Sequence, residues 1–150
     1  VWGTVLSARG QVGYVHDWQN NEDVPIDERF YLGGISTIRG FENREVGPRD
    51  EFGDFIGGET EAFFNFEFIF PLYEELKIKG VTFFDVGNAW SSDDYWDEDD
   101  QVFGSWRYSA GAGIRWLSPL GPMRFEYGYN LDPRDYESDS KFDFMIGRFF

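Results

Sequence analysis

Several absences restrict what this chain can be. It has no cysteine and a single histidine, which excludes disulfide bonds, thiolate metal sites and metal sites with two histidine ligands. It has no run of about 18 apolar residues, so a transmembrane helix is excluded. Basic residues are scarce: 13 Lys and Arg stand against 28 Asp and Glu, and the formal net charge of −15 would repel the phosphates of a nucleic acid. We therefore expect no nucleic-acid partner.

Aromatic side chains, by contrast, are abundant. They make up 21% of the 150 residues, although 27% of the residues are charged. A transmembrane β-barrel accounts for both values, because alternate residues of each strand face lipid while the others face a polar lumen. A soluble β-sandwich, which also buries one face of each strand, is the alternative, but it would not need so many rings on that face.

Six segments alternate between apolar and polar residues with a period of two, which is typical of strands. They cover residues 4–15, 59–70, 77–90, 106–117, 123–130 and 141–150. The second is the clearest, with Phe64 and Phe66 on one face and Glu61 and Glu67 on the other. Phe63 is an exception to its alternation.

The connections between these segments alternate in length. Long polar loops cover 17–58, 91–105 and 131–140, and tight turns cover 71–76 and 118–122. Outer-membrane barrels have long external loops and short periplasmic turns, so we predict an all-β, antiparallel transmembrane β-barrel segment of about six strands. Known single-chain barrels have at least about eight strands. The chain is then part of a larger barrel, or it self-associates through residues 4–15 and 141–150.

Two further features concern the loops and the start of the chain. The acidic runs at 91–101 and 132–139 are interpreted as solvated loops, with divalent-cation binding at the lipopolysaccharide surface as the alternative. The chain begins at Val1 without an initiator methionine or a signal-peptide pattern, so we expect a mature-chain fragment or an excised piece of a longer protein.

The candidate functional residues lie in the longest loop and on two strands. Arg39 is followed by Gly40 and Phe41, while Glu67 and Asp85 stand among apolar neighbours on the lumen faces of adjacent predicted strands. In a lumen shielded from bulk water, a guanidinium can bridge two carboxylates through charge-assisted hydrogen bonds. The periodicity predicts where the two acids face but not their partner, because another charged loop residue could serve as well.

No arrangement of enzyme residues accompanies this set. His16 is the single histidine and lies at a strand end, and no Ser-His-Asp order or paired-carboxylate spacing occurs. We therefore expect no enzymatic activity, no catalytic residue, no metal and no cofactor.

Several motifs, taken in order along the chain, resemble one family. Residues 38–41 read Ile-Arg-Gly-Phe and are followed by Gly-Pro at 47–48, FNFEFIFP at 64–71, FFDVGNAW at 83–90 and SAGAGIRWLSPLGP at 109–122. This order resembles the sixth external loop and the following strands of BamA-like outer-membrane assembly factors, whose loop tip carries valine or isoleucine before Arg-Gly-Phe. The resemblance covers essentially the whole chain and corresponds to the last six strands of a sixteen-stranded barrel.

The resemblance implies a location in the bacterial outer membrane and a non-enzymatic insertase that assembles β-barrel proteins there. It implies that the loop at about residues 17–58 plugs the lumen, with the Arg39-Gly40-Phe41 tip held by Glu67 and Asp85. It also implies a seam between the first and last barrel strands, where an open strand edge templates an incoming strand.

The end of the chain resembles the terminal β-signal of the family. Its apolar face carries Phe142, Phe144, Ile146 and Phe150. Gly147 stands where the family has a kink-prone glycine, and the resemblance implies that it weakens pairing there and lets the strand bend inward. The implied partners are the lipid bilayer, lipopolysaccharide, unfolded outer-membrane protein clients and, through POTRA domains outside this chain, assembly-machine lipoproteins. A TamA-type translocation factor, a two-partner secretion pore and an inactive barrel fragment are the alternatives.

Overall fold

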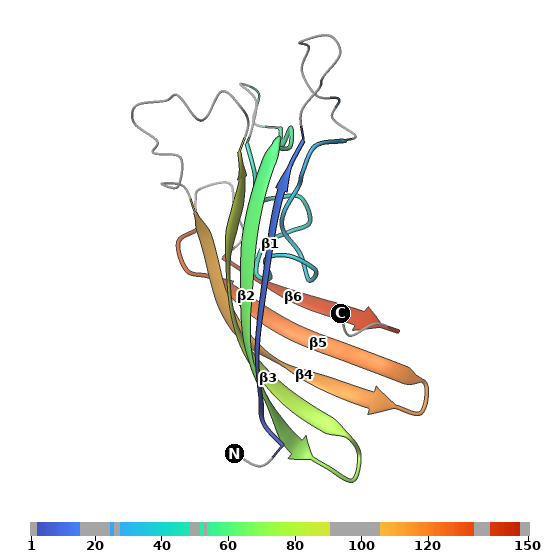
Figure 1. Ribbon diagram of the computed structural model, residues 1–150. Coiled ribbons are helices and arrows are strands. Elements are labelled where there is room, and N and C mark those ends of the chain that lie inside the picture. Colours follow the sequence, from blue (N-terminus) through green and yellow to red (C-terminus); the bar gives the residue numbers. More distant parts are fainter. Residues whose placement is uncertain are drawn as a thin grey trace.

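The computed structural model of this chain describes residues 3–15, 25, 28–48, 52, 54–90, 106–133 and 139–147. Strands in these ranges form one antiparallel sheet in chain order (Figure 1). They are β1 (Val5–Tyr14), β2 (Thr60–Tyr73), β3 (Ile78–Trp90), β4 (Arg107–Ser118), β5 (Gly121–Asn130) and β6 (Ser140–Ile146). None of the described residues belongs to a helix with the length and apolarity needed to cross a membrane. The predicted all-β antiparallel fold is confirmed.

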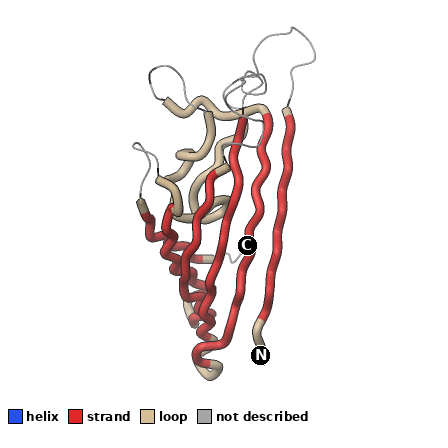
Figure 2. The backbone as a smooth tube through the Cα atoms, turned by 90° about the vertical axis from the view of Figure 1, so that its left-hand side faces the viewer, coloured by secondary structure: helices blue, strands red, loops and turns tan. Residues whose placement is uncertain are grey.

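The sheet is curved, and its two faces differ in chemistry. On β2, Phe64, Phe66 and Phe68 are exposed on the convex face, whereas Glu61 and Asn65 are buried on the concave face. Figure 2 shows the cause: the loop between β1 and β2 lies in the hollow of the sheet. Because alternate residues of a strand point to opposite faces, the period of two in the sequence separates these surfaces. The exposed rings form an apolar band of the kind that meets lipid.

The loop brings its own hydrophobic core to the concave face. The buried cluster consists of Leu32, Ile38, Phe41 and Val46 from the loop and Phe63 and Ala89 from the sheet, with Phe30 packed against it. Phe63, the exception to the alternation of β2, therefore points inward because loop side chains rather than water cover its position. Its ring is only 1% exposed.

Two short antiparallel bridges shape the described part of the loop. Phe30 and Gly58 exchange backbone hydrogen bonds of 2.8 and 2.9 Å, and Leu32 and Val46 exchange bonds of 3.1 and 3.0 Å. Residues 33–45 therefore leave the bridges, reach along the concave face and return, with Arg39 near the far end. His16, residues 17–24 of the same predicted loop, the acidic run at 91–101 with the rest of its loop to 105, and residues 134–138 of the second acidic run lie outside the described residues.

Several strand ends differ from the prediction. The predicted turn at 118–122 is too long, because β4 continues to Ser118 and β5 already starts at Gly121. The predicted turn at 71–76 is wrong in its start, since β2 continues through Pro71 to Tyr73 and the chain turns at 74–77, where Lys77 has a φ of 58°. The sixth strand stops at Ile146, not at Phe150, because Gly147 adopts a φ of +94°, outside the extended region. Phe150 itself lies outside the described residues.

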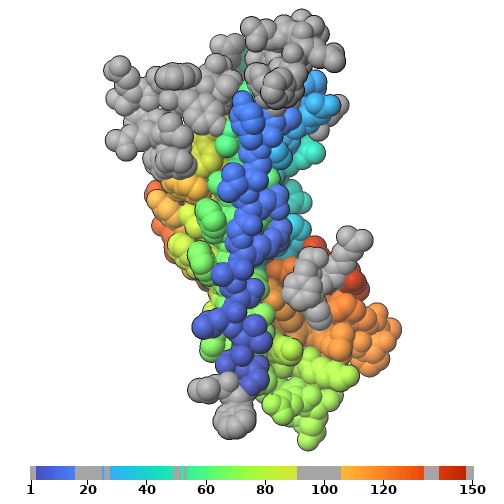
Figure 3. Space-filling model, viewed as in Figure 1, coloured from blue at the N-terminus to red at the C-terminus, as the bar shows by residue number. Residues whose placement is uncertain are grey.

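The described sheet has two edges. β1 pairs with β2, and β6 pairs with β5, so neither edge strand has a second neighbour among the described strands. Figure 3 shows β1 in blue down the middle of the visible face, with green residues of β2 on one side and, in its upper half, cyan residues of the loop on the other. An unpaired edge is costly in lipid. Completion by further strands or by a second copy remains our prediction.

Charge on the convex face of β2 should destabilise the protein. Phe66→Arg is expected to lower the free energy of unfolding by about 2–4 kcal/mol, the range for a basic residue near the bilayer midplane. The measurement is urea unfolding of the full-length protein in lipid vesicles. The control is Gln11→Arg, because Gln11 already bonds Glu61 on the concave side at 2.9 Å. Equal losses in both variants would contradict this assignment of the faces.

Candidate functional site

Arg39 is aimed at the strands by its neighbours in the loop. Ile38 and Phe41 are buried in the loop core on either side of it. Gly40 adopts a φ of +88°, a conformation that favours glycine, and so lets the chain reverse between them. These anchors direct the Arg39 side chain onto the concave face, where only 2% of it is exposed.

Asp85 and Glu67 both bind Arg39. Nε of Arg39 lies 2.7 Å from Oδ2 of Asp85, and Nη2 lies 2.7 Å from Oδ1, which makes a bidentate pair. The backbone N–H of Arg39 also donates to Oδ2 of Asp85 at 3.0 Å. Nη1 of Arg39 lies 2.6 Å from Oε1 of Glu67. The structure therefore brings these three residues together, with one guanidinium bridging β2 and β3.

Side chains of β4 and β5 enlarge this set into a cluster, which we call the charged cluster. Both carboxylate oxygens of Glu126 lie 3.3 Å from Nη1 of Arg39. Nη2 of Arg115 lies 2.7 Å from Glu67 and 2.8 Å from Glu126, and Nη2 of Arg124 lies 2.9 Å from Glu126. With Asp85, three carboxylates face three guanidinium groups, so the charged cluster is neutral as a whole.

Three members of the charged cluster, Arg115, Arg124 and Glu126, are not among the site residues predicted from the sequence. A signal was present, because all three are charged residues at lumen-facing positions of the fourth and fifth predicted strands. Strand periodicity predicts their facing, but it does not predict that the curved sheet brings β4 and β5 up to the same loop tip as β2 and β3.

Burial and charge act in opposite directions on Arg39. Burial lowers the pKa of Arg39, while the hydrogen bond to Asp85 and the negative charges of Asp85, Glu126 and Glu67 raise it by more, so the net shift is upward. Arg39 therefore keeps its positive charge throughout the physiological pH range, and the cluster does not release its loop by deprotonation of this group.

Two uncharged side chains support the pairing of Arg39 and Asp85. The guanidinium carbon of Arg39 lies 3.8 Å from the centroid of the Phe83 ring, a cation–π contact. Nδ2 of Asn65 donates to Oδ1 of Asp85 at 2.9 Å and to the carbonyl of Thr37 at 2.6 Å. Asn65 thus orients the carboxylate and ties the loop to β2 at the same time.

The loop tip also touches the backbone of β5. A Cβ atom added to Gly128 would lie 2.6 Å from the nitrogen of Gly40 and 2.8 Å from its Cα. Such distances are too short for any side chain, so glycine at position 128 sets how closely the loop approaches. The guanidinium carbon of Arg107 then lies 5.7 Å from the ring centroid of Phe41.

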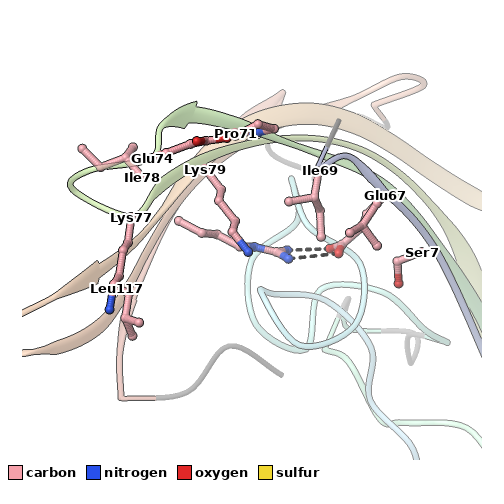
Figure 4. A pocket seen from close by; sticks show the side chains of 12 residues that line it. Ser7, Glu67, Ile69, Pro71, Glu74, Lys77, Ile78, Lys79 and Leu117 are labelled. Carbon is pink, nitrogen blue, oxygen red and sulfur yellow. Dashed lines mark hydrogen bonds and ion pairs between the residues drawn. The ribbon is translucent and has the colours of Figure 1, made fainter. Parts of the chain in front are cut away.

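A cavity of about 690 Å³ borders the charged cluster on the concave face. Figure 4 shows Glu67 at its wall, with dashed lines for the two hydrogen bonds from Arg115. The lining continues past Lys79 to Glu74 and Lys77 at the β2–β3 turn. The loop therefore covers one part of the concave face and leaves a hollow between the charged cluster and that turn.

The residues of the predicted terminal signal lie apart from the charged cluster. Phe142, Phe144 and Ile146 alternate along β6 and are exposed on the convex face. The rings of Phe144 and Phe125 lie 4.9 Å apart, which continues the apolar band across β5 and β6. Phe142, Phe144 and Ile146 thus lie on the opposite face of the sheet from Glu67 and Asp85.

Comparison with known proteins identifies the family. Residues 2–150 match the Omp85 superfamily domain. The chain belongs to the Omp85 superfamily. Among its relatives is the outer membrane protein assembly factor BamA of Nitratidesulfovibrio vulgaris, which is 43% identical over 149 residues, 97% of this chain and 18% of the relative. The BamA of Neisseria meningitidis serogroup B is 31% identical over 171 residues, 97% of this chain and 22% of the relative.

A solved structure agrees with this assignment at the level of the fold. The crystal structure of BamA from Haemophilus ducreyi lacking POTRA domains 1–3 matches this Omp85 chain with a TM-score of 0.77 and 24% identity, over 94% of this chain and 30% of that chain. The resemblance to BamA-like proteins and the location in the outer membrane, both expected from the sequence, are confirmed. The Omp85 chain spans 18% and 22% of the lengths of the two BamA relatives.

Removing the Arg39 side chain from this Omp85 domain should loosen the loop. In Arg39→Ala, Asp85 loses its bidentate partner while Glu67 keeps Arg115. We expect the free energy of opening the loop to fall by about 3–5 kcal/mol, the range for breaking a buried ion pair. Water that enters the site reduces this loss. Hydrogen exchange at the Val46 amide of the full-length protein measures it. Adding Asp85→Ala should recover part of the loss, since it removes the unpaired charge, whereas additive losses would contradict the pairing.

Closing the gap at Gly128 should displace the loop without removing any charge. Gly128→Val is expected to make trypsin cleavage after the exposed Arg44 about tenfold faster, because overpacking costs about 1–3 kcal/mol. Ala112→Val, on the exposed convex side of β4, is the matched control and should leave cleavage unchanged. If both variants are cut at the parent rate, the close approach of Gly40 and Gly128 does not hold the loop.

Proposed function

We propose that this chain is the carboxy-terminal part of the barrel of a BamA-type insertase, which assembles β-barrel proteins into the bacterial outer membrane. The observation that carries the proposal is the charged cluster, because it holds an Arg-Gly-Phe loop tip against strands β2 to β5 of a sheet related to BamA. The loop at about residues 17–58 plugs the lumen, and the cluster is its lock.

The second element of the proposal is the terminal strand. β6 is an edge of the described sheet, and Gly147 ends it with a backbone conformation that a strand does not continue. We propose that this edge forms one side of a seam at which an incoming strand is templated through backbone hydrogen bonds. A Cβ at Gly147 would meet nothing within 4 Å, so the requirement for glycine there is one of backbone conformation and not of space.

The proposed activity involves no covalent step. Strand pairing and burial of apolar side chains in lipid supply the free energy of assembly. The proposed partners are the bilayer with its lipopolysaccharide, unfolded outer-membrane protein clients, and assembly-machine lipoproteins that bind POTRA domains outside this chain. The exposed apolar band on the convex face supports contact with lipid.

Conservative replacement of Arg39 should impair assembly. In a strain depleted of the native protein, full-length Arg39→Lys is expected to lower the yield of folded outer-membrane proteins by about tenfold, because lysine cannot replace the bidentate fork and one charged hydrogen bond is worth about 1.5–3 kcal/mol. The yield is read from heat-modifiable bands on gels.

The matched control is Arg9→Lys, since Arg9 lies exposed on the same face of the sheet and, among the described residues, makes a single 3.4 Å hydrogen bond to the loop, to the carbonyl of Ser36, which lysine can also donate. It should support assembly like the parent. Parental yield in Arg39→Lys, at equal amounts of protein in the membrane, would show that the charged cluster has no part in the activity.

A further inference from the structure

The terminal strand β6 has little to hold it. It contains seven residues, and its pairing partner in the described sheet is β5. On the concave face β6 presents Lys141, Asp143 and Met145, opposite Gly128, Glu126 and Arg124 of β5. Apart from the backbone ladder, β6 is held by ring contacts with β5 on the convex face, such as that of Phe144 with Phe125, and by the contacts on this concave face.

The loop reaches two of these three register pairs. At the first, Gly40 lies against Gly128, and Oε2 of Glu42 lies 3.3 Å from Nζ of Lys141. At the second, Arg39 binds Glu126, whose register partner is Asp143. Three residues within one short stretch of loop thus sit over the junction of β5 and β6.

Charge makes this junction dependent on the loop. Glu126 and Asp143 are buried acids directly opposite each other, and like charges in that position oppose strand pairing. Lys141 offsets Asp143, with Nζ 3.3 Å from Oδ1, and Arg39 is among the cations that offset Glu126. Among the described residues, Oδ2 of Asp143 is buried without a hydrogen-bond partner, so Asp143 depends on Lys141 for its compensation.

The position of Glu42 is set by the loop itself. Its backbone N–H donates to Oε2 of Glu45 at 2.6 Å, and the adjoining Phe41 is fixed in the loop core. An isolated ion pair with one exposed partner contributes little. Here the packing of Gly40 on Gly128 already holds the loop against β5, next to Lys141 of β6. The entropic cost of bringing Glu42 close to Lys141 is therefore offset by that packing and not by the ion pair.

We propose that Glu42 and Lys141 form a latch between the loop and the terminal strand, so that seating of the loop and pairing of β6 with β5 are thermodynamically coupled. Lys141 is a positioning residue in this scheme: it neutralises Asp143 and receives Glu42 when the loop is seated. Withdrawal of the loop loosens β6, and by linkage loosening of β6 releases the loop. The consequence for strand templating rests on the proposed function, but the coupling itself does not.

Hydrogen exchange of the full-length protein in lipid nanodiscs tests the latch. Glu42→Gln removes the ion pair and leaves Lys141 to Asp143, so the fold is retained. We expect the amides of residues 141–146 to exchange about two to five times faster, the factor for one weak ion pair, with β1 unchanged. Glu74→Gln, at an exposed acid of the β2–β3 turn, is the control and should change neither strand. Unchanged exchange of β6 in Glu42→Gln, or an equal rise in β1, would overturn the proposal.

The reverse direction provides the second test. Phe144→Ala, or Phe144→Leu if alanine prevents folding, weakens β6 from its convex face. The latch predicts faster exchange of the Arg39 amide, which is bonded to Asp85 at 3.0 Å in the seated loop. The increase in the exchange rate of the Arg39 amide caused by Phe144→Ala should be smaller when Glu42→Gln is also present. An Arg39 amide that is unaffected by Phe144→Ala would refute the coupling. Assembly is scored separately: coupled exchange with unimpaired assembly in Glu42→Gln would keep the latch and count against the proposed use of β6.

Discussion

Uncompensated charge on the concave face is the constraint on which the structure depends. Strands β2, β3 and β5 place three carboxylates close together, and β4 and β5 supply two guanidinium groups, Arg115 and Arg124. Arg39, carried by the loop, supplies the third. A buried carboxylate without its cation costs several kcal/mol. The sheet without the loop therefore has surplus negative charge at its centre, and the loop tip carries the matching positive charge.

Small residues decide whether that charge can be delivered. Gly40 and Gly128 allow the loop backbone to rest on the backbone of β5. Gly111 leaves room for the ring of Phe83, because a Cβ at position 111 would lie 2.5 Å from its Cζ. This ring makes the cation–π contact with Arg39. The geometry of the ion pairs thus depends on these glycines as much as on the charged side chains.

The strands could be predicted from the sequence because lipid on one face and a polar space on the other enforce a period of two. Their ends could not, since Gly147 stops β6 through its backbone conformation and Pro71 continues β2, and neither effect appears in the alternation. Arg39, Glu67 and Asp85 could be found as candidates from facing and from the family resemblance. Glu126 could not be joined to them, because its contact with Arg39 depends on the curvature of the sheet.

The same limit explains Phe63. An aromatic ring on the polar side of a strand looks like a break in the pattern, and only the presence of loop side chains above it makes the position apolar. The face of a strand to which a side chain points follows from its position in the sequence. What packs against that face depends on the whole fold.

The hydrophobic core of the loop favours its return to the concave face after any displacement. Leaving the sheet would expose Ile38, Phe41 and Phe63 to water in the same step that strips Arg39 of its carboxylates. Burial of one large apolar side chain is worth about 1.5–3 kcal/mol, so the two costs add. The vacated state is then a rare excursion of the ensemble and not a resting conformer. A loop with this energy profile returns to its position on the sheet when the displacing force ends, and needs no separate trigger to do so.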